Sequence, residues 1–168
     1  VLRRCMQLLP GSFRTPSVRA SALPRFFLAA YALLIVYASL YPLSGWRDAG
    51  GAGFAFLLAP WPRYVTAFDL GANFLGYLPF GMLCVLDTRQ RVQGAAALLF
   101  ALASGTALSL SLETAQSFLP ARIPSNLDVA ANIAGTAVGG VAGLRVAPAM
   151  SGGGAFERIR TEAFAPGA

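Results

Sequence analysis

The sequence predicts an all-α fold, an integral membrane protein built as a bundle of about four transmembrane helices. Two observations predict it. First, 56% of the 168 residues are hydrophobic and only 12% are charged, whereas soluble domains average about 25% charged residues. Second, four apolar runs of 18 or 19 residues are separated by polar segments. Each run is long enough to cross a hydrocarbon core of about 30 Å as a helix.

The four runs are Phe26–Leu43, Phe68–Leu86, Ala95–Leu112 and Val129–Val146. In lipid, the backbone polar groups have to be satisfied within the segment, and a helix does this. A soluble protein with these runs would expose large apolar patches, which promote aggregation. We therefore predict a helix over each run, with the lipid bilayer as the main partner of the chain.

Small residues in two runs predict close helix packing. The last run has a small residue at every fourth position: Ala131, Gly135, Gly139 and Gly143. Such a ladder lies on one helix face and lets another helix approach closely. In the second run, Pro79 removes a backbone donor and predicts a kink, with Gly81 close by. We assign Gly135, Gly139, Pro79 and Gly81 to helix packing.

The distribution of arginine predicts the orientation. Residues 1–24 form a basic leader without the continuous apolar stretch of a signal peptide, so the first run is interpreted as a retained helix. Four spans place ten of the thirteen arginines on the side that holds both termini. The positive-inside rule then puts both termini in the cytoplasm, with the spans in the plasma membrane. We predict a cytoplasmic leader (1–24), a transmembrane domain (25–147) and a flexible cytoplasmic tail (148–168).

The basic residues also limit the chemistry. All thirteen are arginine, and the chain has neither lysine nor histidine. This composition excludes a histidine base, a histidine metal ligand, a Schiff-base lysine and a Ser-His-Asp triad. The arginines form no basic stripe, so we expect no nucleic acid partner. We assign no cofactor, no metal site and no catalytic residue.

Three acidic residues stand at the ends of the spans. Asp69 begins the second run, Glu113 follows the third, and Asp128 precedes the fourth. Antiparallel helices bring these three ends to the same membrane face, which by the arginine distribution is extracytoplasmic. Ionisable groups within spans are costly and commonly mark function. We therefore expect a polar cluster at that face.

Amides and one arginine complete the cluster. An amide follows each acid by three or four positions, on the same helix face, and Arg122 lies in the loop between the last two runs. The predicted cluster is Asp69, Asn73, Glu113, Gln116, Arg122, Asp128 and Asn132. A structural alternative stays open, in which the aspartates cap helices and the asparagines join them. Glu113 fits that alternative least, because a carboxylate at a helix C-terminus opposes the dipole, and Arg122 is its expected partner.

Taken in order, these residues resemble the VanZ-like family of bacterial membrane proteins. The resemblance runs from about Tyr37 to Gly143 and is carried by three strings: Asp69-x3-Asn73-x5-Pro79-Phe80-Gly81, Glu113-x2-Gln116-x-Phe118, and Arg122-x5-Asp128-x3-Asn132-x2-Gly135-x3-Gly139. Many relatives have an acidic residue where Ser125 stands, so a fourth carboxylate is missing here. The resemblance implies a protein of the cell envelope and a link to low-level teicoplanin resistance, without an established mechanism.

Three functions remain open at this point. The favoured one is a non-enzymatic envelope protein that binds a lipid-linked precursor or a glycopeptide through the cluster, with Arg122 meeting a phosphate or carboxylate. The second is a membrane-embedded enzyme acting on a lipid headgroup, with Glu113 as acid or base, or with a divalent cation held by the carboxylates. The third is a small transporter, although the acids stand near one face and not at the midplane. The sequence leaves the oligomeric state open.

Overall fold

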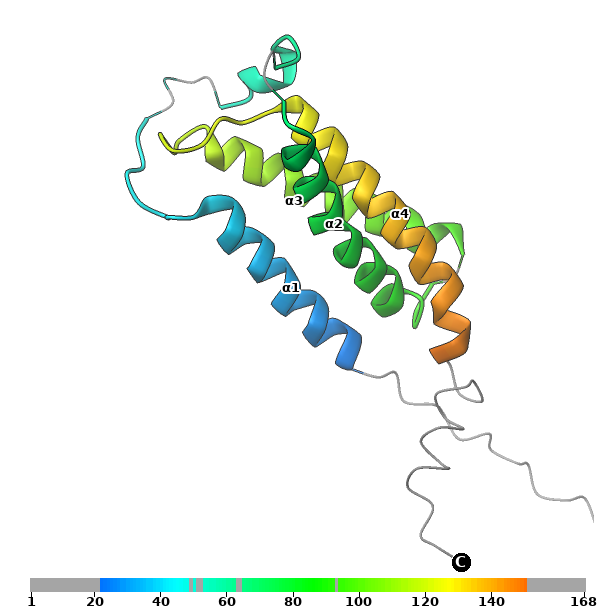
Figure 1. Cartoon of the computed structure of the whole chain (residues 1–168). Coiled ribbons are helices and arrows are strands. Elements are labelled where there is room, and N and C mark those ends of the chain that lie inside the picture. Colours follow the sequence, from blue (N-terminus) through cyan, green and yellow to red (C-terminus); the bar gives the residue numbers. More distant parts are fainter. Residues whose placement is uncertain (1–21, 49, 51–52, 63–64, 93, 151–168) are drawn as a thin grey trace, which may run out of the picture.

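The regular secondary structure in the described part of the chain is all helical. The computed structural model describes residues 22–48, 50, 53–62, 65–92 and 94–150. Most of the predicted leader and tail therefore lies outside the described residues. The elements are α1 (Leu23–Leu40), the short 3₁₀ helix η1 (Ala55–Leu58), α2 (Ala67–Thr88), α3 (Ala95–Gln116) and α4 (Asn126–Met150). The predicted all-α class is confirmed, and Figure 1 shows the arrangement.

All four α-helices are long and apolar enough to cross a membrane. Their surfaces carry large apolar side chains, among them Leu33, Leu75 and Leu99, which are 69%, 63% and 65% exposed. Such surfaces suit lipid and not water. Two predicted spans stop short of the helices at the polar side of the molecule, because α3 continues to Gln116 and α4 already begins at Asn126, whereas the first predicted span runs past the end of α1 at Leu40. Polar residues at helix ends lower the hydropathy there without ending the helix.

Three helices form a packed group and the fourth lies beside it. In Figure 1, α2, α3 and α4 lie together, while α1 runs along one side. Within the described residues, α1 contacts α2 and α3 but not α4. Its only buried residues are Ile35 and Leu40. A polar contact also holds α1 near its middle, where the Tyr31 hydroxyl donates to the carbonyl of Gly76 at 3.0 Å.

The closest packing joins α2 and α4. A methyl group on Gly135 or Gly139 would overlap backbone carbonyls of α2, those of Phe74 and Leu78 respectively. One turn further, a methyl group on Gly143 would stand only 2.9 Å from the carbonyl of Met82. Backbones this close leave no room for a side chain, which is the geometry that small residues permit in membrane helices.

Of the two residues assigned to packing in α2, Gly81 lies in the same interface. Pro79 stands inside α2, which is assigned as a single helix from Ala67 to Thr88. Because proline has no N–H, the carbonyl four residues earlier loses its usual helical donor. Nearby, Gly81 lies against the backbone of Thr136 in α4. The backbones of α2 and α4 therefore come together in the part of α2 that contains Pro79 and Gly81, two residues that weaken a helix.

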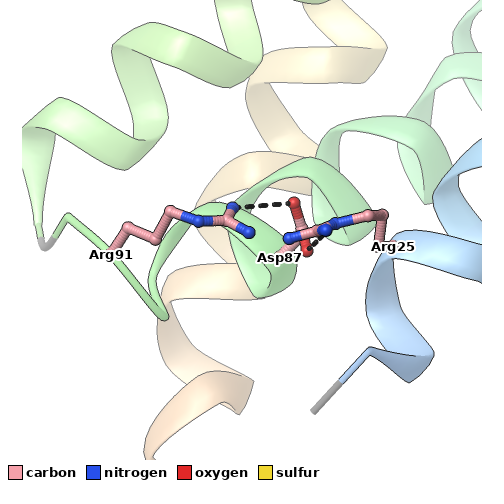
Figure 2. A network of polar contacts seen from close by, with 3 residues as sticks. All are labelled: Arg25, Asp87 and Arg91. Atoms are coloured by element: carbon pink, nitrogen blue, oxygen red, sulfur yellow. Dashed lines mark hydrogen bonds and ion pairs between the residues drawn. The ribbon is translucent and has the colours of Figure 1, made fainter. Parts of the chain in front are cut away.

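A polar network joins the helices at the end of the bundle where α1 begins and α4 ends. Asp87 forms ion pairs with two arginines: its carboxylate lies 3.7 Å from Nε of Arg25, and it accepts a hydrogen bond of 3.4 Å from Nη1 of Arg91. Figure 2 shows the carboxylate between the two guanidinium groups. Arg89 donates to the carbonyl of Leu144 at 2.9 Å. These contacts tie α1 and α4 to the end of α2.

Candidate functional site

A cavity of about 620 Å³ lies at the opposite end of the bundle. Its walls come from the last turns of α1, the first half of α2, the end of α3 and the start of α4. Six of the seven predicted cluster residues line it: Asp69, Asn73, Glu113, Gln116, Arg122 and Asp128. The seventh, Asn132, does not. The antiparallel order of the helices thus brings together side chains that stand up to 59 positions apart in the sequence (128 minus 69).

Glu113 lies at the inner wall and is only 3% exposed. Its Oε2 accepts a hydrogen bond of 2.8 Å from the backbone N–H of Ser125. This bond closes the loop between α3 and α4, since it crosses from the last turn of α3 to the residue just before α4. We expected Arg122 to be the partner of Glu113. The guanidinium attracts the carboxylate electrostatically, but in the described residues both ion pairs belong to Asp87.

Arg122 and Gln116 instead bind the end of α1. The last carbonyls of a helix have no intrahelical donor. Arg122 Nη2 donates to the Ala38 carbonyl at 2.8 Å, and Gln116 Nε2 donates to the Ser39 carbonyl at 3.2 Å. The negative end of the helix dipole favours a cation at this place. Arg122 therefore forms its hydrogen bond with a backbone carbonyl and not with Glu113, and backbone carbonyls leave no side-chain signal in the sequence.

Asp69 is part of a capping box at the start of α2. The Thr66 hydroxyl accepts from the backbone N–H of Asp69 at 3.1 Å, while Asp69 Oδ2 accepts from the Thr66 hydroxyl at 2.7 Å and from its backbone N–H at 3.3 Å. One turn later, Asn73 Nδ2 donates to the backbone carbonyl of Asp69 at 3.1 Å. The exposed Asp69 thus has a structural role at the cavity mouth, and the Thr66-x2-Asp69 spacing predicts this cap.

Asp128 lies in the first turn of α4, whose N-terminus is capped by Ser125. The Ser125 hydroxyl accepts from the backbone N–H groups of Leu127 and Asp128, at 3.2 and 3.4 Å. The Asp128 carboxylate is half-buried, with the Asn73 amide beside it and the like charges of Asp69 and Glu113 near enough to repel it. Ser125 therefore positions both Glu113 and Asp128. It stands at the position where the family pattern often has an acidic residue.

Two buried polar groups continue from the cavity into the bundle. Tyr77 lines the cavity at its deep end and is 4% exposed. Its hydroxyl lies near Ser109 and Glu113 but makes no hydrogen bond within the described residues. Below it, Asn132 donates to the Ser109 hydroxyl at 2.9 Å, while Asn132 Oδ1 is buried without a partner there. Asn132 thus joins α3 to α4, and Tyr77, a single aromatic in an apolar run, gave no signal in the sequence.

The carboxylates of the cavity are spread over several helix ends. Within the described residues, no three acidic or thiol side chains come close enough to hold a metal ion. Glu113 also has one of its oxygens committed to Ser125. The cavity therefore offers separate charged and amide groups and not a compact ligand sphere.

The helices and the cavity define a class of protein, a polytopic membrane protein with a polar cavity at one end of an apolar bundle. A family model described as VanZ/LLP1 matches residues 25–146, most of the chain. The chain belongs to the VanZ/LLP1 family. Neither a curated protein nor a solved structure matches it.

Proposed function

We propose that this protein binds a polar ligand of the bacterial cell envelope in the cavity, without catalysing a reaction, and that binding lowers susceptibility to glycopeptides such as teicoplanin. The observation that carries the proposal is the convergence of six polar side chains from α2, α3, α4 and the loop before α4 on one cavity. Its volume, about 620 Å³, is in the range of sites for small molecules or headgroups.

Arg122 is the group that meets an acidic part of the ligand. Its Nη2 binds Ala38, and a guanidinium has five donors, so further donors remain for a phosphate or carboxylate. The amides of Asn73 and Gln116 supply neutral donors and acceptors for hydroxyl groups. Binding is favoured over catalysis because the chain has no histidine or lysine to activate a nucleophile.

The proposal includes a location. The cavity faces the outside of the inner membrane, and the chain ends lie in the cytoplasm. In the described helices and loops, four arginines lie near the end where α1 begins and α4 ends: Arg25, Arg89, Arg91 and Arg145. Two arginines, Arg47 and Arg122, lie at the cavity end. This asymmetry supports the orientation by the positive-inside rule.

The test is antibiotic susceptibility of cells that express single variants at matched membrane levels. Arg122→Gln and Asp128→Asn remove one charge each from the cavity, and loss of one charge-assisted bond weakens binding by about tenfold. We expect both variants to restore susceptibility to teicoplanin. The matched control is Asp87→Asn, which removes a charge at the other end of the bundle. Wild-type resistance in both cavity variants would refute the proposal.

A further inference from the structure

The charge of the cavity is unbalanced. Three carboxylates line it, from Asp69, Glu113 and Asp128, against the single guanidinium of Arg122. Asp128 lies close enough to the other two for their charges to repel. In the described part of the chain the ion pairs are found at the opposite end, on Asp87. A ligand that adds a positive charge near Asp128 would relieve this repulsion.

An organic ammonium suits this site better than a metal ion. The carboxylates are not grouped closely enough, among the described residues, to hold one metal. An ammonium group has three hydrogen-bond donors on one nitrogen, so it can bind one carboxylate directly and attract the others through its charge.

One wall of the cavity is apolar and lies within the spans. Phe68, Ala72 and Gly76 line it at intervals of four residues along one face of α2, and Ile35 and Ala38 line it from α1. From Phe68 to Tyr77 the lining covers nine residue steps, about 14 Å of helix, nearly half of a hydrocarbon core of about 30 Å. A cavity for a purely water-soluble ligand has no need of such a wall.

The apolar wall, which α1 and α2 contribute, has free space at Gly76, and we call this space the crevice. A methyl group added there would meet no heavy atom within 4 Å. Because α1 is peripheral and makes no contact with α4 in the described residues, the crevice lies at the edge of the bundle, where lipid is the neighbour. An acyl chain can therefore lie in it while a headgroup occupies the polar part.

We infer that the cavity takes a membrane amphiphile whose headgroup carries an ammonium group, with the ammonium against Asp128 and Asp69 and the apolar chain in the crevice at Gly76. The acidic group of the same headgroup meets Arg122. The inference rests on the proposed function, because it names the class of ligand for the same cavity.

The experiment is native mass spectrometry of the purified full chain in detergent, titrated with single lipids. Phosphatidylethanolamine carries the ammonium, the phosphate and the chains. Phosphatidylglycerol lacks the ammonium, and phosphoethanolamine lacks the chains. We expect phosphatidylethanolamine to bind about fivefold more tightly than phosphatidylglycerol, as one partly buried charge contact predicts, and more tightly than phosphoethanolamine, which leaves the apolar wall uncovered. If phosphatidylglycerol binds as tightly as phosphatidylethanolamine, the inference is overturned. If phosphoethanolamine binds as tightly as phosphatidylethanolamine, the site takes a soluble ligand and the inference is also wrong.

Two variants separate the polar and apolar parts of the site. Asp128→Asn should abolish the preference for phosphatidylethanolamine over phosphatidylglycerol. Gly76→Leu fills the crevice and should weaken the binding of both lipids. The control is Gly71→Leu, at a second helical position with open space, which should leave lipid binding unchanged. If either cavity variant binds like wild type, the inference is wrong. If the protein does not bind these lipids but Arg122→Gln still changes teicoplanin susceptibility, the proposed function is retained and only the inferred class of ligand is wrong.

Discussion

Arg122 donates a hydrogen bond to the carbonyl of Ala38 across 2.8 Å, joining two residues 84 positions apart. The bond connects the loop before α4 to the last turn of α1. Gln116 makes a similar contact with Ser39 from the end of α3. The cavity residue best suited to an acidic ligand thus also holds the wall of the cavity. A ligand that withdraws Arg122 from Ala38 would loosen the end of α1.

Removing this contact should release the end of α1. We expect Arg122→Leu to lower the free energy of unfolding by about 1.5–3 kcal/mol, the range for hydrogen bonds to charged groups. Hydrogen exchange should accelerate in the last turn of α1 and remain unchanged in α2. Arg47→Leu is the control, because Arg47 is exposed and does not line the cavity. Unchanged exchange in Arg122→Leu would show that the bond does not hold α1.

The carboxylate of Glu113 should be replaceable by an amide but not by a hydrocarbon. Glu113→Gln retains an oxygen that can accept from the Ser125 N–H, so its stability should stay close to wild type. Glu113→Leu leaves that buried N–H without a partner, which costs about 1–3 kcal/mol. Thermal unfolding of the two purified variants in detergent provides the comparison. Equal melting of Gln and Leu variants would contradict the structural role of this bond.

The α2–α4 interface should not tolerate one added methyl group. Gly139→Ala places a carbon against the Leu78 carbonyl, and overpacking of this kind costs about 1–3 kcal/mol. Gly71→Ala is the matched control, since its added methyl group meets open space and alanine favours a helix over glycine. The measurement is the unfolding equilibrium in mixed detergent micelles. A Gly139→Ala protein as stable as the control would show that the helices separate without cost.

The Asp87 network should contribute little and depend on salt. Arg25 and Arg91 are more than half exposed, with side-chain exposures of 59% and 54%, and ion pairs with exposed partners contribute about 0–1 kcal/mol. We therefore expect Asp87→Asn to lower stability by less than about 1 kcal/mol at low ionic strength, and by still less at high salt. Thermal unfolding at two salt concentrations measures this difference. A large loss that salt leaves unchanged would show that Asp87 is more deeply coupled than its partners' exposure indicates.

The proposed orientation can be tested by cysteine labelling of intact cells. With Cys5 and Cys84 replaced by alanine, Ser44→Cys places a thiol at an exposed position near the cavity end, and Gln90→Cys places one at the other end. A membrane-impermeant maleimide should label Ser44→Cys in intact cells and Gln90→Cys only after permeabilisation. The reverse pattern would invert the orientation.

The fold could be predicted from the sequence because its main signal is local. Each span is a continuous apolar run, and hydropathy finds it without knowledge of any neighbour. The helix ends were predicted less well, since Asn126 and Asp128 belong to the first turn of α4 although they are polar. There, capping and not hydropathy decides where the helix begins.

The cavity could be predicted only in part. The alternation of helix direction is enough to bring Asp69, Glu113 and Asp128 to one end. The actual partners could not be predicted, because Glu113 binds a backbone N–H and Arg122 a backbone carbonyl. Backbone groups are present at every residue and leave no trace in the sequence. The buried hydroxyl of Tyr77 was likewise hidden, since its neighbours come from other helices.

The glycine contacts between α2 and α4 also bear on the order of assembly. These two helices touch most closely, yet α3 is synthesised between them. During synthesis, α2 therefore enters the bilayer before the helix that fits against it exists, and α4 completes the interface only when it leaves the ribosome. A chain interrupted after α3 would present α2 with its closest contact surface still uncovered. Membrane proteases and insertases could recognise such a chain as unfinished.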